Sequence, residues 1–336
     1  MKALKYFAYG ICAAGIFGML LEGGENAHAQ SSALKVLEDR QYKSADSAAT
    51  DIVSGDGRWM MHLQSSALGE RMAGDRIVLT DTRSGLSRVI FDTAPSGEPT
   101  LMDSIELLAF SPNDKEAMFI LSGATWYYPR DVMTIGVDGS GLKQLTKATP
   151  AKWLANDGGY AVNDAQYSRD GKRILLSIER VAKNDPQGGE VQSAVALIRS
   201  DAEKQAAFAI AEGHALFWSA DGRSFYYEAT DGSTQRFYPS THTRVGAGPI
   251  RGSQLGRVPD HDAVFVETES GQLAIDTLDG KTVDPKTAAS AAAIPLHDAA
   301  GRKLSSIVPC EGHRVMLRYG PSARDPQVHT QRILFP

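Results

Sequence analysis

The fold of this chain is decided by residues 107–146, which read LLAFSPNDKEAMFILSGATWYYPRDVMTIGVDGSGLKQLT. Three apolar runs in this stretch have the length and composition of β-strands, at residues 107–110, 117–121 and 132–137. Asn, Asp and Gly between the runs favour tight turns because they tolerate positive φ. A fourth, more polar strand is expected at residues 142–146. The stretch therefore predicts one sheet of four antiparallel strands, which needs neighbouring sheets to bury both of its faces.

A short turn motif repeats along the chain and predicts these neighbours. Ser-x-Asp-Gly begins at Ser54, Ser168 and Ser219, and the variant Ser-Pro-Asn-Asp begins at Ser111. The spacing of roughly 50–57 residues is long for a propeller blade but normal once loops vary. A β-sandwich with chance Asp-Gly turns is the alternative, since sandwiches also space short strands regularly. The regularity favours an all-β fold, a six-bladed β-propeller of four-stranded antiparallel blades, with seven blades if the first 50 residues contain one more.

The central repeat resembles a known propeller family. Phe110-Ser-Pro-Asn-Asp, then Asp131-Val-Met-Thr and Val137-Asp-Gly-Ser-Gly-Leu-Lys-Gln-Leu-Thr146, is similar to the TolB-type propeller repeat. Related repeats form the propeller halves of dipeptidyl-peptidase-like serine peptidases and of oligogalacturonate lyases. The resemblance is sharp over residues 110–146 and fades after about Gly248. It implies a propeller without the second domains of those proteins, and folds of this type host many functions.

The first 29 residues have the pattern of a secretory signal peptide. Lys2 and Lys5 provide a positive start, residues 6–21 are apolar, and Ala27-His28-Ala29 offers a cleavage site. The apolar core is too short to span a bilayer comfortably. Ile11 precedes Cys12 where a lipoprotein signal needs a small residue. We expect a periplasmic or secreted protein with no membrane span and no lipid anchor.

After the signal, residues 30–50 are expected to form an N-terminal arm and residues 51–336 the propeller. In closed propellers a terminal strand often completes the last blade, and residues 34–37 could do this beside residues 331–335.

The last two blades are less regular than the others. Residues 263–267 and 272–277 reproduce the middle strands of a fifth blade, which lacks the turn motif. Asp298-Ala299-Ala300-Gly301 is a degenerate turn at the start of a sixth. The Ala-rich residues 287–293 fit a helical turn or a connector better than a strand.

Charge and cysteine content exclude some classes of function. The chain has 35 Lys and Arg against 40 Asp and Glu, a net charge of −5, and no basic stripe, so nucleic acid is not an expected partner. Cys310 would be the single cysteine left after signal cleavage, which excludes an intrachain disulfide. No cofactor is expected; a divalent metal in the axial channel stays open, although no ligand spacing supports it. We expect a monomer.

The two faces of the predicted disc differ in loop length. With strands a to d counted outward from the axis, the a–b and c–d turns are short. The b–c loops and the connectors between blades, on the other face, are long: residues 65–75, 123–131, 179–192, 95–103, 147–163 and 250–260. Long loops on a rigid scaffold usually carry binding. We therefore expect the ligand site on the long-loop face.

Aromatic and polar side chains converge on this face and form the candidate ligand site. The aromatic candidates are Trp126, Tyr127, Tyr128, Trp153 and Tyr160. The polar candidates, at the entry of the innermost strands, are Glu106, Asn163 and His214. Rings of this kind suit sugars and peptides. The competing interpretation is that they pack the loops onto the propeller and that the polar groups merely line a solvated channel.

The leading interpretation is a non-catalytic, exported cell-envelope protein that binds a protein, peptide or glycan through the long-loop face. The alternative is a propeller enzyme, such as a polysaccharide lyase or hydrolase, with an acid–base or metal site at the axial mouth formed by Glu106, Asp164, His214 and His261. A third interpretation is a structural subunit that spaces other envelope components. The sequence does not identify the ligand or decide between these three.

Overall fold

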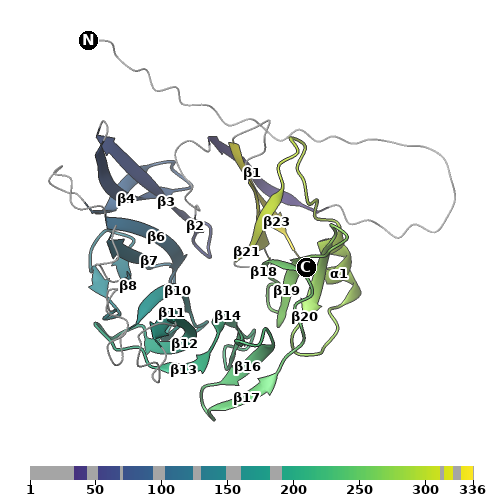
Figure 1. The fold of residues 1–336 in the computed structure, drawn as a ribbon. Coiled ribbons are helices and arrows are strands. Elements are labelled where there is room, and N and C mark those ends of the chain that lie inside the picture. The colour runs from purple at the N-terminus through teal and green to yellow at the C-terminus, as the bar shows by residue number, and fades with distance from the viewer. Residues whose placement is uncertain are drawn as a thin grey trace. The chain divides into compact units, whose positions relative to one another are not determined.

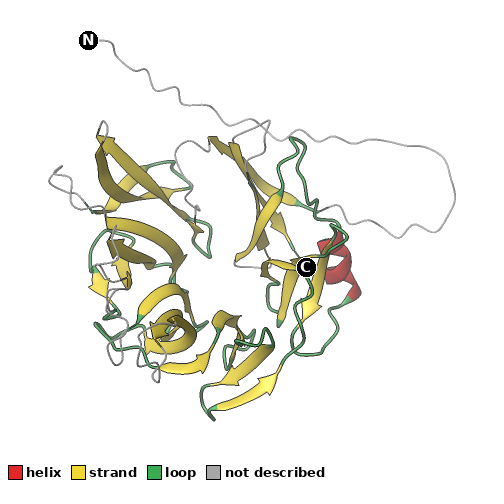
Figure 2. Cartoon of the chain, viewed as in Figure 1, coloured by secondary structure: helices red, strands yellow, loops and turns green. Residues whose placement is uncertain are grey.

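The computed structural model describes residues 34–43, 52–68, 71–93, 103–123, 130–148, 160–181, 191–310, 314–320 and 327–335. Leu34–Pro336 forms one compact unit. Within the described ranges the unit is built almost entirely of β-strands, with one α-helix, α1 (Pro285–Ala292) (Figures 1 and 2).

Four four-stranded antiparallel sheets follow one another along the chain, each with its strands in sequence order. Sheet 1 contains β2 (Ile52–Val53), β3 (Trp59–Leu68), β4 (Arg71–Asp81) and β5 (Ser87–Asp92). Sheet 2 contains β6 (Asp103–Phe110), β7 (Glu116–Gly123), β8 (Arg130–Gly136) and β9 (Lys143–Gln144). Sheet 3 contains β10 (Ala161–Tyr167), β11 (Arg173–Val181), β12 (Val191–Arg199) and β13 (Ala209–Glu212). Sheet 4 contains β14 (His214–Trp218), β15 (Phe225–Glu228), β16 (Thr234–Tyr238) and β17 (Thr243–Gly246).

The remaining strands form a seven-stranded sheet, sheet 5, in the order β1-β23-β22-β21-β18-β19-β20. Its strands are β1 (Val36–Lys43), β18 (Ser253–Arg257), β19 (Ala263–Glu267), β20 (Leu273–Thr277), β21 (Leu304–Cys310), β22 (Arg314–Tyr319) and β23 (Gln327–Leu334). β18 and β21 pair in parallel through Gly256 and Ile307. A Cβ at Gly256 would collide with the Ile307 carbonyl, so this approach requires glycine.

Hydrophobic clusters lie between consecutive sheets, because alternate residues of a strand point to opposite faces. In β7, Phe119 packs with Ile77 of sheet 1, whereas Met118 packs with Ile174 of sheet 3. In β15, Phe225 packs with Leu175 of sheet 3, whereas Tyr226 packs with Val264 of sheet 5. Sheets with apolar residues on both faces, packed face to face in chain order, are the architecture of a β-propeller, as predicted.

The repeated turn motif forms the connection between the first and second strands of sheets 1 to 4, and its hydrogen bonds explain its composition. The buried Ser54 hydroxyl donates to Asp56 (2.7 Å) and accepts from Trp59 N (2.8 Å), while Asp56 also accepts from Arg58 N (2.8 Å). Ser168 and Ser219 make the same bonds to Asp170 and Asp221. The serine and aspartate are thus selected to satisfy the turn's own polar groups.

The glycine of the motif is required by its backbone conformation. Gly171 and Gly222 have φ of 69° and 67°, which confirms the predicted positive φ. In the variant turn of sheet 2, Asp114 takes this place with φ of 56°.

These turns lie on one side of the unit, here called the turn face, and neighbouring turns bond to one another. The Asp114 carboxylate accepts from the backbone N–H groups of Gly55 (2.8 Å) and Asp56 (2.9 Å). Arg169 Nη1 donates to the Ala220 carbonyl (2.8 Å). The opposite side, which carries the connections between second and third strands, is the loop face.

The N-terminal strand joins the two ends of the chain. β1 pairs antiparallel with β23, with Val36 opposite Ile333 and Lys43 opposite Gln327. An ionic network, buried except at Asp39, supports this pairing: His329 of β23 bonds to Asp39 of β1 (2.6 Å) and to Asp298 (2.7 Å), and Asp298 also accepts from Arg302 Nε (2.6 Å).

Three expectations about the second half and the loops are wrong. Residues 250–260, expected as a connector, contain β18. This inner strand is short and mostly polar, so its sequence lacks the apolar run of the other inner strands. Residues 65–68 and 71–75, expected in a loop, belong to paired strands, with Ser65 opposite Asp75 and Leu68 opposite Arg71. The turn at Asp298–Gly301 precedes β21, the strand that pairs with β18, so it is not a copy of the repeated turn.

Candidate functional site

The predicted aromatic cluster lies largely outside the described residues. The structure does not describe Trp126, Tyr127, Tyr128 and Trp153, so these four candidates stay predictions. Tyr160 is described, and its prediction as a ligand-binding ring is wrong: it is 2% exposed. Its hydroxyl donates to the Gln205 carbonyl (2.8 Å) and accepts from Lys147 N (3.0 Å), and burial raises its pKa to about 12. Tyr160 therefore ties sheet 2 to sheet 3 rather than contacting a ligand.

The polar candidates at the loop-face entry lie on successive inner strands, β6, β10 and β14. Glu106 on β6 pairs with Arg130 (2.9 Å), and Arg130 Nε also donates to the Val162 carbonyl of β10 (2.8 Å). Asn163 on β10 donates to Glu179 (2.8 Å), and the exposed His214 begins β14. The neighbouring Asp164 accepts from Gln166 (3.1 Å). These contacts are local and hold neighbouring strands together.

His261 does not join this group. It lies in the turn between β18 and β19, where Val258 N donates to the Ala263 carbonyl (3.0 Å), just as Ser54 N donates to Trp59 (2.8 Å). That turn is on the turn face, whereas His214 is at the start of an inner strand on the loop face. The expected grouping of His261 with Glu106 and His214 is wrong, because residues 250–260 contain the inner strand β18 and are not a connector.

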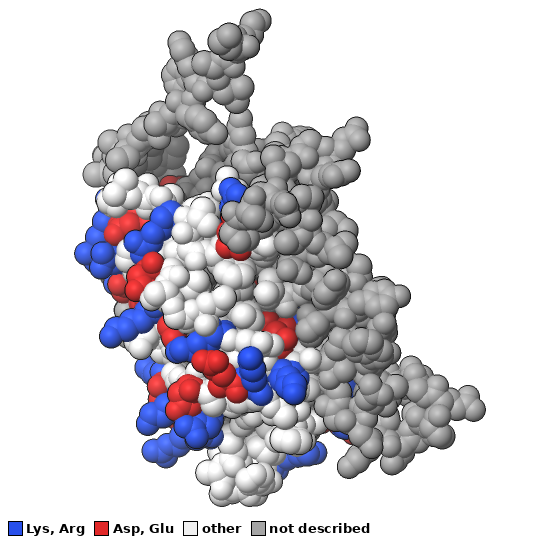
Figure 3. Space-filling model, turned by 90° about the vertical axis from the view of Figure 1, so that its left-hand side faces the viewer, with Lys and Arg blue, Asp and Glu red and all other residues white. Residues whose placement is uncertain are grey.

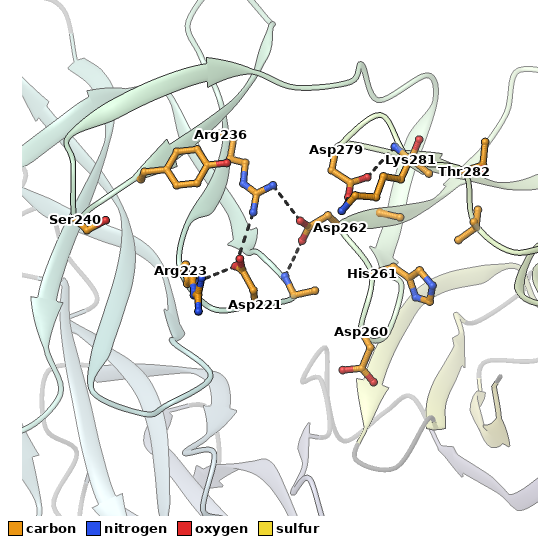
Figure 4. A pocket seen from close by; sticks show the side chains of 15 residues that line it. Asp221, Arg223, Arg236, Ser240, Asp260, His261, Asp262, Asp279, Lys281 and Thr282 are labelled. Carbon is orange, nitrogen blue, oxygen red and sulfur yellow. Dashed lines mark hydrogen bonds and ion pairs between the residues drawn. The ribbon is translucent and has the colours of Figure 1, made fainter.

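A hollow on the turn face, between sheet 4 and β18–β20 of sheet 5, is here called the charged cleft (Figure 4). Its volume is about 660 Å³. The side chains that define its chemistry come from three turns and one strand, namely Asp221, Arg223, Arg236, Asp260, His261, Asp262, Asp279 and Lys281. Charges of both signs, four carboxylates among them, therefore surround a space large enough for several ligand residues.

Arg236 is the central cation of the charged cleft. Its Nη1 lies 3.3 Å from Asp262 and its Nη2 lies 3.8 Å from Asp221. Its Nε donates to the buried Ser224 hydroxyl (2.7 Å), and its guanidinium lies over the rings of Tyr226 and Tyr238 (5.3 and 5.1 Å). These contacts fix the guanidinium in place before any ligand arrives.

Asp262 connects sheets 4 and 5. Its Oδ1 accepts from the backbone N–H of Ala220 (2.6 Å), which belongs to the neighbouring repeated turn, while its Oδ2 faces Arg236. Its side chain is 9% exposed. Asp262 therefore has a structural role, and its charge is already compensated by sheet 4.

The carboxylates whose pKa values are perturbed stay ionised at neutral pH. Burial raises the pKa of Asp221, but hydrogen bonds from Ser219 and Arg223 N, and the charge of Arg236, lower it on balance. Asp279 behaves in the same way: burial acts against bonds and charge from Lys281, and the pKa falls. Lys281 Nζ lies 2.9 Å from Asp279, which raises the lysine pKa. These groups are suited to electrostatic recognition and poorly suited to proton transfer near pH 7.

Charge is also mixed among the described residues on the side of the unit that Figure 3 shows. In the side view of Figure 3, Lys and Arg are interspersed with Asp and Glu, and neither sign forms a continuous patch. Within the described ranges, no group of three or more His, Cys, Asp or Glu side chains is arranged to hold a metal ion. The one described helix, α1, is too short and polar to cross a bilayer, and no other described helix exists to do so.

Sequence reasoning did not identify the charged cleft. The long loops predict a ligand site on the loop face, whereas the charged cleft is built largely from short turns. The available signal was the recurrence of Asp in the turns at Asp221, Asp262 and Asp279, which the propeller strand order places on one face of adjacent sheets.

No protein-family model matches the chain, and no curated protein matches its sequence. Several solved structures are similar in fold. The hydrazine synthase of Kuenenia stuttgartiensis is 16% identical over 69% of this chain and 71% of its own, with a TM-score of 0.42. The β-propeller domain of the trilobed protease from Pyrococcus furiosus is 10% identical over 84% and 78%, with a TM-score of 0.46. The acylaminoacyl peptidase of Pyrococcus horikoshii is 10% identical over 81% and 42%, with a TM-score of 0.49.

Proposed function

We propose that this protein is an exported, non-catalytic β-propeller of the cell envelope that binds a polypeptide partner through the charged cleft. The observation that carries the proposal is the pair of fixed salt bridges, Arg236–Asp262 (3.3 Å) and Lys281–Asp279 (2.9 Å), on the walls of an open hollow. Groups held in this way present both signs of charge at set positions. A segment of polypeptide with both acidic and basic side chains complements them better than a neutral glycan does.

The proposal includes a six-bladed disc, with sheet 5 counted as two blades. The inner strands β6, β10 and β14 each carry one extra residue opposite the second strand of their sheet. β18 and β21 have the same irregularity opposite β19 and β22. On this basis β18 and β21 are both inner strands, and β1 is the outermost strand of the sixth blade. Helix α1, which contacts β20, then occupies the place of the fourth strand of the fifth blade.

An enzyme is less well supported by the described residues. Of the four catalytic candidates, Glu106 is committed to Arg130, Asp164 accepts from Gln166 and Ala165 N, and His261 lies on the other face from His214. The four described candidates therefore do not form one site, as acid–base catalysis requires.

The proposal is tested by site-specific photo-crosslinking in the producing cell. A benzophenone amino acid at Ser240, an exposed residue of the charged cleft, is expected to give a discrete adduct with one envelope protein. The same group at the exposed Ser87 of β5, far along the ring in sheet 1, is the control for non-specific labelling. Adduct yield from Ser240 should fall as salt rises, because exposed charge pairs are screened.

Charge reversal at the rim provides the matched variants. Lys281 is 83% exposed at its side chain, so Lys281→Glu is expected to fold, with a small loss of stability from the like charge of Asp279, and to remove most of the adduct. Arg199→Glu, at an exposed pair on sheet 3, is the control and should have no effect. Equal adducts from Ser87 and Ser240, or an adduct that persists in Lys281→Glu, would contradict the assignment of the site.

A further inference from the structure

A second hollow lies on the other side of sheet 4, between it and sheet 3, at the loop-face end. Its volume is about 440 Å³. Sheet 3 contributes Arg180 of β11 and all four residues of β13. Sheet 4 contributes Tyr227 of β15, Arg244 of β17, and Ala229 and Thr230 of the turn that follows β15. The hollow shares no residue with the charged cleft and faces the opposite side of the unit.

The hollow exists because the second strands of the two sheets differ in length. β11 has nine residues, whereas β15 has four and turns back at Ala229–Gly232. Arg180, near the end of β11, therefore extends beyond the last residue of β15. Its side chain, 25% exposed, lines the hollow that the short strand leaves at this end of sheet 4.

Two guanidinium groups from different sheets line this space. Arg244 Nη2 donates to the Ile210 carbonyl (2.9 Å), which leaves its other N–H groups for a further acceptor. Arg180 Nη2 lies 3.4 Å from Glu212, at the long limit of a hydrogen bond. Arg180 Nε is buried and makes no hydrogen bond with any described residue. A buried donor without an acceptor is unfavourable, so a ligand oxygen placed there would be favoured.

The charge of the lining indicates which anion fits. Arg180 and Arg244 carry two positive charges, and Glu212, the single acidic residue of the lining, removes one, which leaves a net charge of +1. A monoanion balances this charge, whereas a phosphate dianion would be overcompensated beside Glu212. Guanidinium groups also match the planar, two-oxygen geometry of a carboxylate.

We propose that this hollow is a carboxylate-binding site, in which Arg180 and Arg244 hold the carboxylate group of a ligand between sheets 3 and 4. Glu212 opposes the ligand's charge and keeps the affinity moderate. The site is independent of the polypeptide-binding function assigned to the charged cleft, because it uses different residues on the opposite face.

The proposal is tested by titrating the purified mature protein with N-acetylglycine, a minimal monocarboxylate, at constant ionic strength in chloride. Saturable binding is expected by calorimetry or by chemical-shift changes, whereas the uncharged N-acetylglycinamide should not bind. Arg180→Gln and Arg244→Gln should each weaken binding at least tenfold. Arg199→Gln, at an exposed ion pair that lines neither hollow, is the matched control and should bind like the parent.

The sharpest variant is Glu212→Gln, which should bind N-acetylglycine several-fold more tightly because the opposing charge is gone. Glu212 is 56% exposed, so this variant should fold normally even if an arginine variant does not. Binding that is unchanged in Glu212→Gln contradicts the charge argument. Equal binding of the amide, or tighter binding of inorganic phosphate than of N-acetylglycine, overturns the proposed ligand class.

Discussion

Replacing Asp298 by Asn should destabilise the protein by releasing the N-terminal strand from the C-terminal one. Asp298 is buried, with 3% of its side chain exposed, and its Oδ2 accepts from Arg302 Nε (2.6 Å) and from His329 Nδ1 (2.7 Å). Its Oδ1 accepts from the backbone N–H groups of Ala300 and Arg302 (both 2.9 Å). The carboxylate is therefore the acceptor on which Arg302, 2% exposed, and His329, 6% exposed, both depend.

Two effects set the loss of folding stability in Asp298→Asn. Burial raises the pKa of Asp298, but hydrogen bonds from Arg302 and His329 and the charge of Arg302 lower it from 3.8 to about 2. At about 1.36 kcal/mol per pKa unit, this difference corresponds to about 2.5 kcal/mol of folding stability at neutral pH. Asn also removes the negative charge that the buried Arg302 bonds to, and removal of one partner of a buried pair costs about 3–5 kcal/mol. We expect a loss of about 3 kcal/mol.

The sign of the pH dependence follows from the lowered pKa. A carboxyl group with a folded-state pKa below its unfolded value stabilises the fold above the unfolded pKa, near 3.8, and the contribution is lost as pH falls through about 2. The stability difference between the parent and Asp298→Asn should therefore be constant near neutral pH and shrink between about pH 4 and pH 2.

The assay is urea unfolding followed by tryptophan fluorescence, with hydrogen exchange of β1 and β23 as a local readout. Asp201→Asn is the matched control: Asp201 pairs with Arg199 at 2.7 Å, but both side chains are mostly exposed, so the urea midpoint should stay at that of the parent. The reasoning would be refuted if Asp298→Asn unfolded at the same urea concentration as the parent. Unchanged exchange of β1 would separately refute the claim that this network holds the N-terminal strand.

Four further predictions concern the turns, the core, the loop face and export. Gly171→Val should cost about 1–3 kcal/mol in urea melts, because a β-branched residue is strained at φ of 69°; the same change at an extended position should cost less. Thr146→Val should cost about 1–3 kcal/mol, since the Thr146 hydroxyl bonds both Asp131 (2.6 Å) and Val132 N (2.9 Å) in the interior, and an unchanged melt would argue against these bonds. If the loop face binds a ligand, Trp126→Ala should weaken binding by about 1–2 kcal/mol in a titration. Mass spectrometry of the protein from producing cells should find the chain starting at Gln30, and retention of Met1 would contradict export.

The repeat could be predicted from the sequence because its signals are local. The turn motif satisfies its own hydrogen bonds within six residues, as Ser54, Asp56 and Trp59 show, so it can be recognised without knowing the rest of the fold. The apolar runs on either side of it are buried on both faces, and therefore remain continuous and easy to find. Both signals fail for β18, where Val258-Pro259-Asp260-His261-Asp262 makes the same turn with different residues.

The site could not be predicted in the same way because it depends on pairs of residues from different sheets. Arg236 has no distinguishing sequence context, and it acquires its role from Asp262, which is 26 residues away, and from two tyrosine rings. The pairing of β1 with β23 also depends on residues that are distant in the sequence. Asp39 and His329 are 290 residues apart, yet their side chains bond at 2.6 Å. Only the strand order of the complete unit brings such partners together.

The hollow between sheets 3 and 4 has a physical origin that the sequence does contain. Sheet 4 has strands of only four or five residues, whereas β11 and β12 of sheet 3 have nine each. At about 3.3 Å per residue, the second strand of sheet 4 is about 16 Å shorter than that of sheet 3. A short sheet placed beside a longer one cannot cover its ends, and Arg180, near one of those ends, lines the hollow. The charged cleft has a different origin, because β18–β20 on its other side are also only five residues long. In this chain, the shortening of the strands from sheet 3 to sheet 4 therefore marks the proposed carboxylate site more directly than a long loop does.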